Sequence, residues 1–413
     1  MSRPIRVLVC GGGIAGNAVA LQLLRAGIDT TVVERAPAPR PGGQAVDLRG
    51  PSRKVAERMG LMPGIRKRQL HERGMVFIDE RGRGRARMPA EMFGGEGFVA
   101  EIEIARGELN QVLLDEIAGL PAESGSLDYR YGEWVEDIDQ DAETVKARFA
   151  SGAAAEFDVV IGADGLNSAL REKVFGPREQ FVEYLGAYIG FFTIPTPPGT
   201  NVETGWVGVY PVPGSTVALR PDPDPATSMA IISTRIPADP ALRGDLEAQQ
   251  RLIRERLTGY GWVIPDILDA MPDAPDFYFD EVARVRMPHW SKGRVVMLGD
   301  AACCGSPMTG MGTALAIIGA YLLAGEIATT PTDLPRAFDR YEELLRPLVT
   351  TIQKGTETQV RLRHPETRRG VAIMHILIET LMSRPLSPLR ALLTRLIGKQ
   401  AEYPLPDYPA VEN

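Results

Sequence analysis

The pattern of apolar and polar positions at the start of the chain predicts a strand, a helix and a second strand. Residues 5–10 are rich in Val and Ile, as in a parallel strand that is buried on both faces. Three glycines follow, and apolar residues then recur at helical spacing until Gly27. The second strand covers residues 30–34 and ends on a carboxylate, Glu34.

Two later stretches repeat this strand-and-loop pattern. Residues 157–161 form an apolar strand that runs into a loop containing Asp164. Residues 294–298 form another that runs into Asp300, and a long apolar helix follows from 314 to about 328. Parallel sheets bind ligands at the carboxyl ends of their strands, so we expect Asp164 at a ligand-binding edge.

Between these stretches the pattern changes to short alternating runs with many prolines. Residues 181–279 contain several such runs, which predict an antiparallel sheet with proline-marked turns. In one run, Trp206, Gly208 and Tyr210 share a face. Trp206 and Tyr210 are therefore candidates for lining a substrate pocket, and core packing explains the same alternation equally well.

Composition limits the possible functions. A chain of 413 residues is long enough for two domains, and a net charge of −7 without a basic run disfavours a nucleic-acid partner. We expect no signal peptide and no membrane span, because no run of about 18 apolar residues occurs.

The cysteine and histidine positions give no metal-ligand spacing, and we expect a reducing, cytoplasmic location. Cys10 falls in a predicted buried strand, where it acts as a small apolar side chain. The adjacent pair Cys303 and Cys304 is compatible with a vicinal disulfide, a reactive thiol or simple space filling.

The first glycine loop has the chemistry of a dinucleotide site. Gly11 permits a tight turn, Gly13 lets a pyrophosphate approach the backbone, and Gly16 allows the helix to pack closely on the strand. The positive end of the helix dipole faces the phosphates. Glu34, 18 residues after Gly16, is placed to accept hydrogen bonds from an adenosine ribose and would repel a 2′-phosphate.

A second glycine loop, residues 306–313, leads into the long apolar helix and would also favour negative charge at its amides. Arg106 stands at the start of another helix, where it could bind a ligand or pair with a surface acid. The segment that contains Val46 and Asp47 lies one loop beyond Glu34. It is either an ordinary surface connection or a contact for the far end of a long cofactor.

The three motifs, in this order, resemble the FAD-dependent aromatic hydroxylases of the para-hydroxybenzoate hydroxylase type, the group A flavoprotein monooxygenases. The motifs are the first glycine loop with Glu34, Gly162–Gly165 with Ser168 and Arg171, and Gly299-Asp300 with the second glycine loop. The likeness runs from Ile5 to about Ala328, while the inserted sheet matches only in position and character.

The resemblance implies an α/β fold with a Rossmann-like FAD-binding domain, an inserted antiparallel-sheet substrate domain and C-terminal helices. The resemblance is to the compact members of the family, which lack a thioredoxin-like domain. The expected FAD-binding segments are 1–72, 101–178 and 284–330. The expected substrate-domain segments are 73–100 and 179–283, and the expected C-terminal helices cover 331–413.

The resemblance also implies residue roles. Asp164 would lie in the motif linked to FAD and to transient NAD(P)H contact, and the second glycine loop would place amides against the flavin N1–C2=O edge. The implied cofactor-binding residues are Gly11, Gly13, Ile14, Ala15, Gly16, Glu34, Arg35, Arg106, Asp164, Asp300, Pro307, Gly310, Met311 and Gly312. The candidate substrate residues are Val46, Asp47, Trp206 and Tyr210. Cys303 and Thr313 depart from the family, which often has His and Asn there.

The implied reaction is oxygen insertion, most simply hydroxylation, into an aromatic or polycyclic small molecule. It would use FAD, NAD(P)H and O2 through a flavin C4a-hydroperoxide, and it would need no catalytic side chain in the usual sense. A flavin oxidase or reductase without oxygen insertion is the alternative enzyme class, and a flavin-binding sensor is the non-catalytic one. The sequence leaves open the substrate, the choice between NADH and NADPH, and whether the protein is a monomer or a homodimer.

Overall fold

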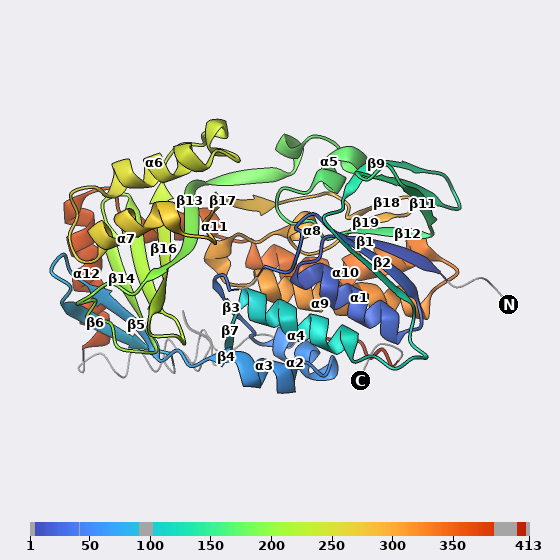
Figure 1. Ribbon diagram of the computed structural model, residues 1–413, viewed down its shortest axis with the longest axis horizontal. Helices are drawn as coiled ribbons and strands as arrows, with labels where there is room; N and C mark the ends of the chain where they lie inside the picture. The colour runs from blue at the N-terminus through green and yellow to red at the C-terminus, as the bar shows by residue number, and fades with distance from the viewer. Residues whose placement is uncertain (1–4, 41, 91–101, 384–402, 410–413) are drawn as a thin grey trace.

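The computed structural model describes residues 5–40, 42–90, 102–383 and 403–409. Two large sheets lie side by side along the long axis of the molecule, each with its own helices (Figure 1). One sheet belongs to the predicted dinucleotide-binding part and the other to the inserted part. The expected α/β class with an inserted, mainly antiparallel sheet and C-terminal helices is confirmed.

The first sheet has six strands in the order β18-β19-β12-β1-β2-β8, parallel throughout except for β18. Its central strand is fully buried at Val7, Leu8 and Val9, as its apolar run predicts. The strands are β1 (Arg6–Cys10), β2 (Asp29–Glu34), β8 (Leu127–Tyr131), β12 (Val159–Gly162), β18 (Ser291–Lys292) and β19 (Val295–Met297).

Helices cover one face of this sheet and a small meander lies on the other side. The helices are α1 (Ile14–Arg25), α9 (Gly312–Thr329) and α10 (Leu334–Ile352), and the meander strands are β9 (Val135–Gln140), β10 (Val145–Phe149) and β11 (Ala154–Phe157). By length and composition α9 is apolar enough to cross a membrane, but 78% of it is buried inside the protein. We therefore interpret α9 as a core helix.

The second sheet has seven strands in the order β17-β13-β16-β15-β14-β5-β6. All neighbours are antiparallel except β14 and β5, which are parallel. The strands are β5 (Gly74–Ile78), β6 (Gly84–Pro89), β13 (Val182–Pro195), β14 (Trp206–Val212), β15 (Ser215–Pro221), β16 (Thr227–Arg235) and β17 (Tyr278–Val285).

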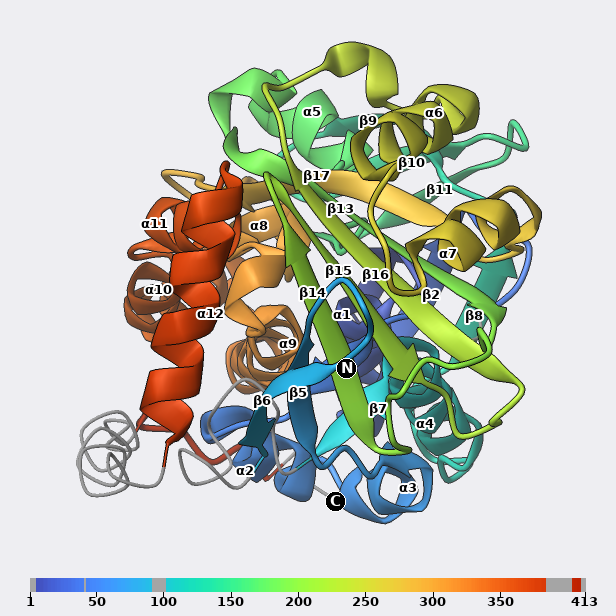
Figure 2. The same ribbon diagram turned by 90° about the vertical axis from the view of Figure 1, so that its left-hand side faces the viewer.

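Helices α6 (Leu246–Leu257) and α7 (Ile264–Ala270) cover one face of the second sheet. The opposite face is turned toward the lobe that contains the first sheet (Figures 1 and 2). The chain then returns through α11 (Thr356–Arg363) and α12 (Arg368–Met382). Figure 2 shows α12 running along the edge of this sheet beside β6.

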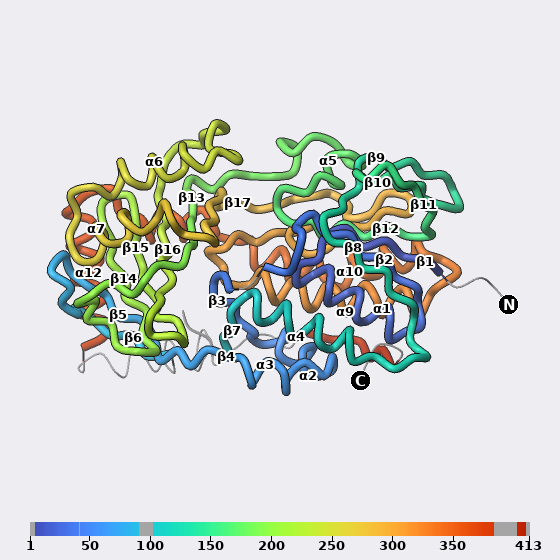
Figure 3. The backbone as a smooth tube through the Cα atoms, viewed as in Figure 1, coloured from blue at the N-terminus to red at the C-terminus, as the bar shows by residue number. Residues whose placement is uncertain are grey.

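A small three-stranded sheet and several helices lie where the two lobes meet, and the tube in Figure 3 shows the chain passing between the lobes there. The small sheet contains β3 (Ala45–Asp47), β7 (Glu103–Ala105) and β4 (Gln69–Leu70). The remaining helices are α2 (Pro51–Arg58), α3 (Met62–Arg68), α4 (Arg106–Ala118), α5 (Ala169–Phe175) and α8 (Asp300–Cys303).

Candidate cofactor and substrate site

The three glycines of the first loop have different structural roles. Gly11 has φ +113°, and a Cβ there would collide with the carbonyl oxygen of Ala163. A Cβ on Gly16 would collide with the carbonyl oxygen of Gly11, so this glycine permits the close approach of α1 to the loop. At Gly13 the nearest atom to an added Cβ is Arg106 Nη2, 3.8 Å away. Gly13 therefore faces open space.

That open space suits an anion. Helix α1 begins at Ile14 with no side-chain cap and no acidic residue in its first turn, so the amides of Ile14, Ala15 and Gly16 sit at an uncapped positive helix end. The geometry fits the pyrophosphate of a dinucleotide in the way that the sequence predicts.

Glu34 is fixed at the end of β2 by the backbone. Its two carboxylate oxygens accept hydrogen bonds from Gly12 N at 2.7 Å and Ala36 N at 2.8 Å. The next residue, Arg35, places its guanidinium 5.4 Å from the centre of the Trp134 ring. The carboxylate thus lies beside the first glycine loop, where a ribose-binding acid is expected.

Sequence reasoning missed a buried polar cluster beneath this loop. Asn17 Nδ2 donates to Gly12 O at 2.8 Å and to Asn110 Oδ1 at 2.9 Å, and the Tyr129 hydroxyl donates to Asn17 Oδ1 at 3.0 Å. The partners are about a hundred residues apart in the chain, so no local pattern could have revealed them. The cluster holds the loop rigid against α4 and β8.

Arg106 and Asp300 approach the two glycine loops from different elements. Arg106 is the first residue of α4, and its amide donates to Gln44 O at 3.0 Å. Asp300 follows Gly299, which has φ +62°, and its Oδ1 lies 3.7 Å from the position of a Cβ on Gly312. Arg106 therefore lies by the first loop and Asp300 by the second.

Asp300 is an exposed residue beside the second glycine loop. The surrounding protein atoms nevertheless raise its pKa by desolvation, while a hydrogen bond from Cys304 and the charge of Arg106 act in the opposite direction. The positive charge of Arg106 thus favours the ionised form of Asp300.

The second glycine loop has an unusual backbone. Ser306 has φ +85°, a value that is rare for a residue with a side chain, and the short 3-10 helix Pro307–Thr309 follows it. Gly310 is left-handed at φ +65°, and Met311 N donates to the Thr309 hydroxyl at 3.2 Å. Helix α9 then begins at Gly312 without a side-chain cap. Strained backbone of this kind is concentrated at functional sites.

Asp164 turns its carboxylate toward its own loop. It accepts hydrogen bonds from the Ser168 hydroxyl and from Leu170 N, at the start of α5. Burial raises its pKa, and the bond from Ser168 opposes that shift. The neighbouring Arg171 donates to Ala301 O at 2.9 Å, which ties this loop to the Asp300 turn. Direct contact of Asp164 with a cofactor remains a prediction.

Asp47 lies at the second glycine loop. Its Oδ2 is 3.2 Å from the position of a Cβ on Gly310, and it forms an ion pair with Arg49 at 2.5 Å. Asp47 also stands directly across from Glu103 in the small sheet. Burial raises its pKa, and the charge of Arg49 opposes the shift. Val46 packs partly against the main core.

The two faces of the second sheet decide the role of Trp206 and Tyr210. Tyr210 packs in the core that includes residues of α6 and α7, and Trp206 packs with Val76 and Ile78 on the same side. Both are buried on the face turned away from the second glycine loop. Their contacts are those of core residues, which is one of the two alternatives that the sequence leaves open.

The opposite face of this sheet meets the second glycine loop. Met308 of that loop packs in one cluster with Phe191 from β13 and Met229 from β16. Val207 and Val209 of β14 point to the same side as Ile231, which also contacts that cluster. An apolar wall therefore faces the loop.

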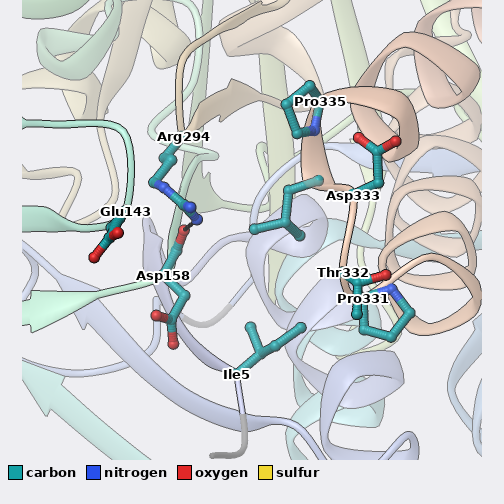
Figure 4. A pocket seen from close by; sticks show the side chains of 9 residues that line it. Ile5, Glu143, Asp158, Arg294, Pro331, Thr332, Asp333 and Pro335 are labelled. Carbon is teal, nitrogen blue, oxygen red and sulfur yellow. Dashed lines mark hydrogen bonds between the residues drawn. The ribbon is translucent and has the colours of Figure 1, made fainter. Parts of the chain in front are cut away.

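Two cavities occur elsewhere. One, of about 240 Å³, is lined by Ile5, Asp158, Arg294 and residues 331–335 (Figure 4). It lies at the amino ends of the parallel strands, opposite the edge where such sheets bind ligands, so we do not assign it to the site. The other, of about 340 Å³, is lined by Asn167, Asp280 and their neighbours.

Neither metal nor thiol chemistry is indicated among the residues that the structure describes. They contain no group of three or more His, Cys, Asp or Glu side chains that could hold a metal ion. Cys10, Cys303 and Cys304 are free and buried. Burial raises the pKa of all three thiols, so they stay protonated and unreactive. The cysteine pair therefore forms no vicinal disulfide in this structure, and its burial favours the space-filling interpretation.

Two glycine loops at the edge of a parallel sheet, facing an inserted sheet, are typical of a dinucleotide-binding protein. Residues 4–355 match the family described as "FAD binding domain". The chain belongs to this family, the flavoprotein monooxygenases of the para-hydroxybenzoate hydroxylase type. The family resemblance inferred from the sequence motifs is confirmed.

Several relatives support this membership. A flavin-dependent monooxygenase of Legionella longbeachae is 35% identical over 86% of this chain and 88% of its own length. The FAD-dependent monooxygenase asL4 of Sarocladium schorii is 32% identical over 98% of both chains. The crystal structure of tetracycline destructase Tet(55) is 31% identical, covers 99% of this chain and 100% of its own, and superposes with a TM-score of 0.82.

Proposed function

We propose that the protein is an NAD(P)H- and FAD-dependent monooxygenase that uses O2 to insert one oxygen atom into an aromatic or polycyclic small molecule, most simply by hydroxylation. The observation that carries this proposal is the apolar wall of the inserted sheet facing the second glycine loop. Family membership supplies the flavin, and the wall supplies a place for an apolar ring beside it.

In this proposal the chain binds FAD through the residues that the sequence analysis singled out. The uncapped start of α1 holds the pyrophosphate, Glu34 accepts hydrogen bonds from the ribose, and Arg106 and Asp300 contact the cofactor between the two loops. The uncapped start of α9, preceded by Gly310, stabilises negative charge on the reduced flavin. When bound, the flavin supplies the hydride-accepting and oxygen-activating chemistry.

The protein's own contribution is then positioning and exclusion of water. Phe191, Met229 and Met308 come from three elements and are each at most 8% exposed, so they form a dry apolar cluster at the second glycine loop. Such a cluster holds an apolar ring in place and protects a reactive oxygen species from water. No side chain needs to act as a nucleophile.

We further propose a polycyclic substrate. The supporting relative is tetracycline destructase Tet(55), which matches this chain over nearly its whole length. Tetracycline is therefore the first compound to test, together with simple phenols and other fused-ring aromatics.

The test is aerobic oxidation of NADH and of NADPH by FAD-loaded protein, with and without each compound, with peroxide measured in parallel. We expect a polycyclic compound to stimulate oxidation and to yield a product heavier by one oxygen atom. The FAD-free protein is the control and should give neither. Oxidation that no compound stimulates, or that yields peroxide alone, would contradict oxygen insertion and favour the oxidase or reductase alternative.

A further inference from the structure

Tyr278 is a large aromatic residue that the core does not enclose. It begins β17 at the edge of the seven-stranded sheet and is 43% exposed. Its neighbour Phe279 packs in the core beneath α6 and α7, so alternation directs Tyr278 to the face that meets the second glycine loop. Its register partner is Phe191, with ring centres 6.2 Å apart.

Hydrogen bonds fix the phenol in this position. The Tyr278 hydroxyl donates to Asp280 Oδ2 at 3.2 Å, and Asn167 Nδ2 donates to the same oxygen at 3.0 Å. Asn167 belongs to the loop that follows β12 in the first lobe, whereas Tyr278 and Asp280 belong to the inserted sheet. One carboxylate oxygen thus joins the two lobes at this point.

Ring packing places Tyr278 near the second glycine loop, because its cross-strand partner Phe191 shares a cluster with Met308 of that loop. Its pKa is raised by burial of the hydroxyl and by the charge of Asp280, and the charges of Arg106 and Asp300 also act on it. The hydroxyl therefore stays protonated at neutral pH and keeps its hydrogen bond to Asp280. Arg106 and Asp300 are the side chains that lie by the first and second glycine loops.

We propose that Tyr278 is a cofactor-contacting residue supplied by the inserted sheet, which covers the FAD held between Arg106 and Asp300. Asp280 and Asn167 are positioning residues that hold the phenol there. This inference rests on the proposed FAD site. It implies that the two lobes must be docked before the cofactor is fully enclosed, because the covering side chain and its anchor come from opposite sides of the junction.

FAD affinity gives the first test. We would titrate the apoprotein of wild type, Tyr278→Phe and Tyr278→Ala with FAD. We expect the Kd to rise about threefold for Tyr278→Phe through loss of the hydroxyl, and about tenfold for Tyr278→Ala through loss of the ring as well. Asn167→Ala should have an effect close to that of Tyr278→Phe.

The matched control is Tyr184→Phe. Tyr184 lies in the same sheet, and its hydroxyl also donates one hydrogen bond, to Ile236 O at 2.7 Å. It packs with the cluster on the covered face of the sheet, away from the cleft. Its substitution should change protein stability but leave the FAD Kd unchanged.

Flavin fluorescence gives a second readout that a structural role would not change. A phenol in contact with an excited flavin donates one electron and takes it back, which quenches emission without net chemistry; phenylalanine cannot do this. We expect brighter bound flavin in both Tyr278 variants and no change in Tyr184→Phe.

Three outcomes would overturn the proposal. Unchanged FAD Kd and emission with a lowered melting temperature would show that Tyr278 is only a structural link. An effect confined to the rate of flavin reduction by NAD(P)H would place the contact on the nicotinamide instead. Wild-type protein that binds no FAD would overturn the proposed function itself.

Discussion

Replacing Gly13 with alanine adds a single methyl group where the first glycine loop faces open space. The backbone there has φ −82° and ψ −172°, which any residue adopts, so alanine introduces no strain. The nearest atom to the new Cβ is Arg106 Nη2 at 3.8 Å, an ordinary contact. We therefore expect the stability of the apoprotein to change by less than about 0.5 kcal/mol.

Cofactor binding should respond very differently. A methyl group at this point prevents a phosphate from reaching the amides at the start of α1. Loss of one charge-assisted hydrogen bond costs about 2 kcal/mol, which weakens binding roughly 30-fold. Gly16→Ala is the contrasting variant, because its Cβ collides with the carbonyl oxygen of Gly11 and should impair folding itself.

The assay is a calorimetric titration of the apoprotein with FAD, together with thermal unfolding of the apoprotein. Gly13→Ala should unfold at the wild-type temperature and bind FAD much more weakly. If Gly13→Ala bound FAD with the wild-type Kd, the pyrophosphate would not lie over this loop. The whole assignment of the site would then be refuted.

Three other predictions follow from burial and packing. Burial lowers the pKa of His364, so the unfolded chain takes up a proton more readily than the folded one, and stability should fall as pH drops below about 6.5. Urea unfolding at about pH 5 and about pH 7.5 should show this loss of unfolding free energy in wild type and a smaller loss in His364→Gln. An equal loss in both proteins would show that His364 does not cause the pH dependence. Tyr210→Phe should leave the KM for substrate unchanged, whereas Phe191→Ala should raise the KM about tenfold. The reverse result would show that the substrate binds at the face of the sheet that carries Tyr210. Native protein should resist iodoacetamide at Cys303 and Cys304 and react after unfolding; rapid native labelling would contradict their burial.

The sequence predicts those parts of the site that depend only on residues close together in the chain. The first glycine loop, Glu34 and the second glycine loop each follow a strand and precede a helix or turn, so their chemistry can be read within about thirty residues. Helix α4 and its first residue Arg106 are also local features. The structure brings all of them to one edge of the parallel sheet.

The parts that the sequence does not predict depend on long-range packing. Alternation correctly shows that Trp206 and Tyr210 share a face, but it cannot say which face α6 and α7 will cover. The contact of Tyr129 with Asn17 joins residues 112 apart in the chain. In the sequence, Tyr278 is recognisable only as an aromatic residue at the start of a strand. Its exposure depends on how the two sheets pack against each other.

The interleaving of the two sheets has a consequence for how the chain folds during synthesis. The inserted sheet is assembled from β5 and β6, β13 to β16, and β17, which alternate along the chain with strands of the first sheet. While the ribosome is still translating the region before Val295, β12 has no β19 to pair with, and α1 lacks its partner α9. The first lobe therefore cannot mature until its last strands and α9 have been made, and nascent or truncated chains would present an open strand edge to chaperones and to one another. We expect the folding of this protein to be slow and largely post-translational, since its contacts connect residues so distant in the chain.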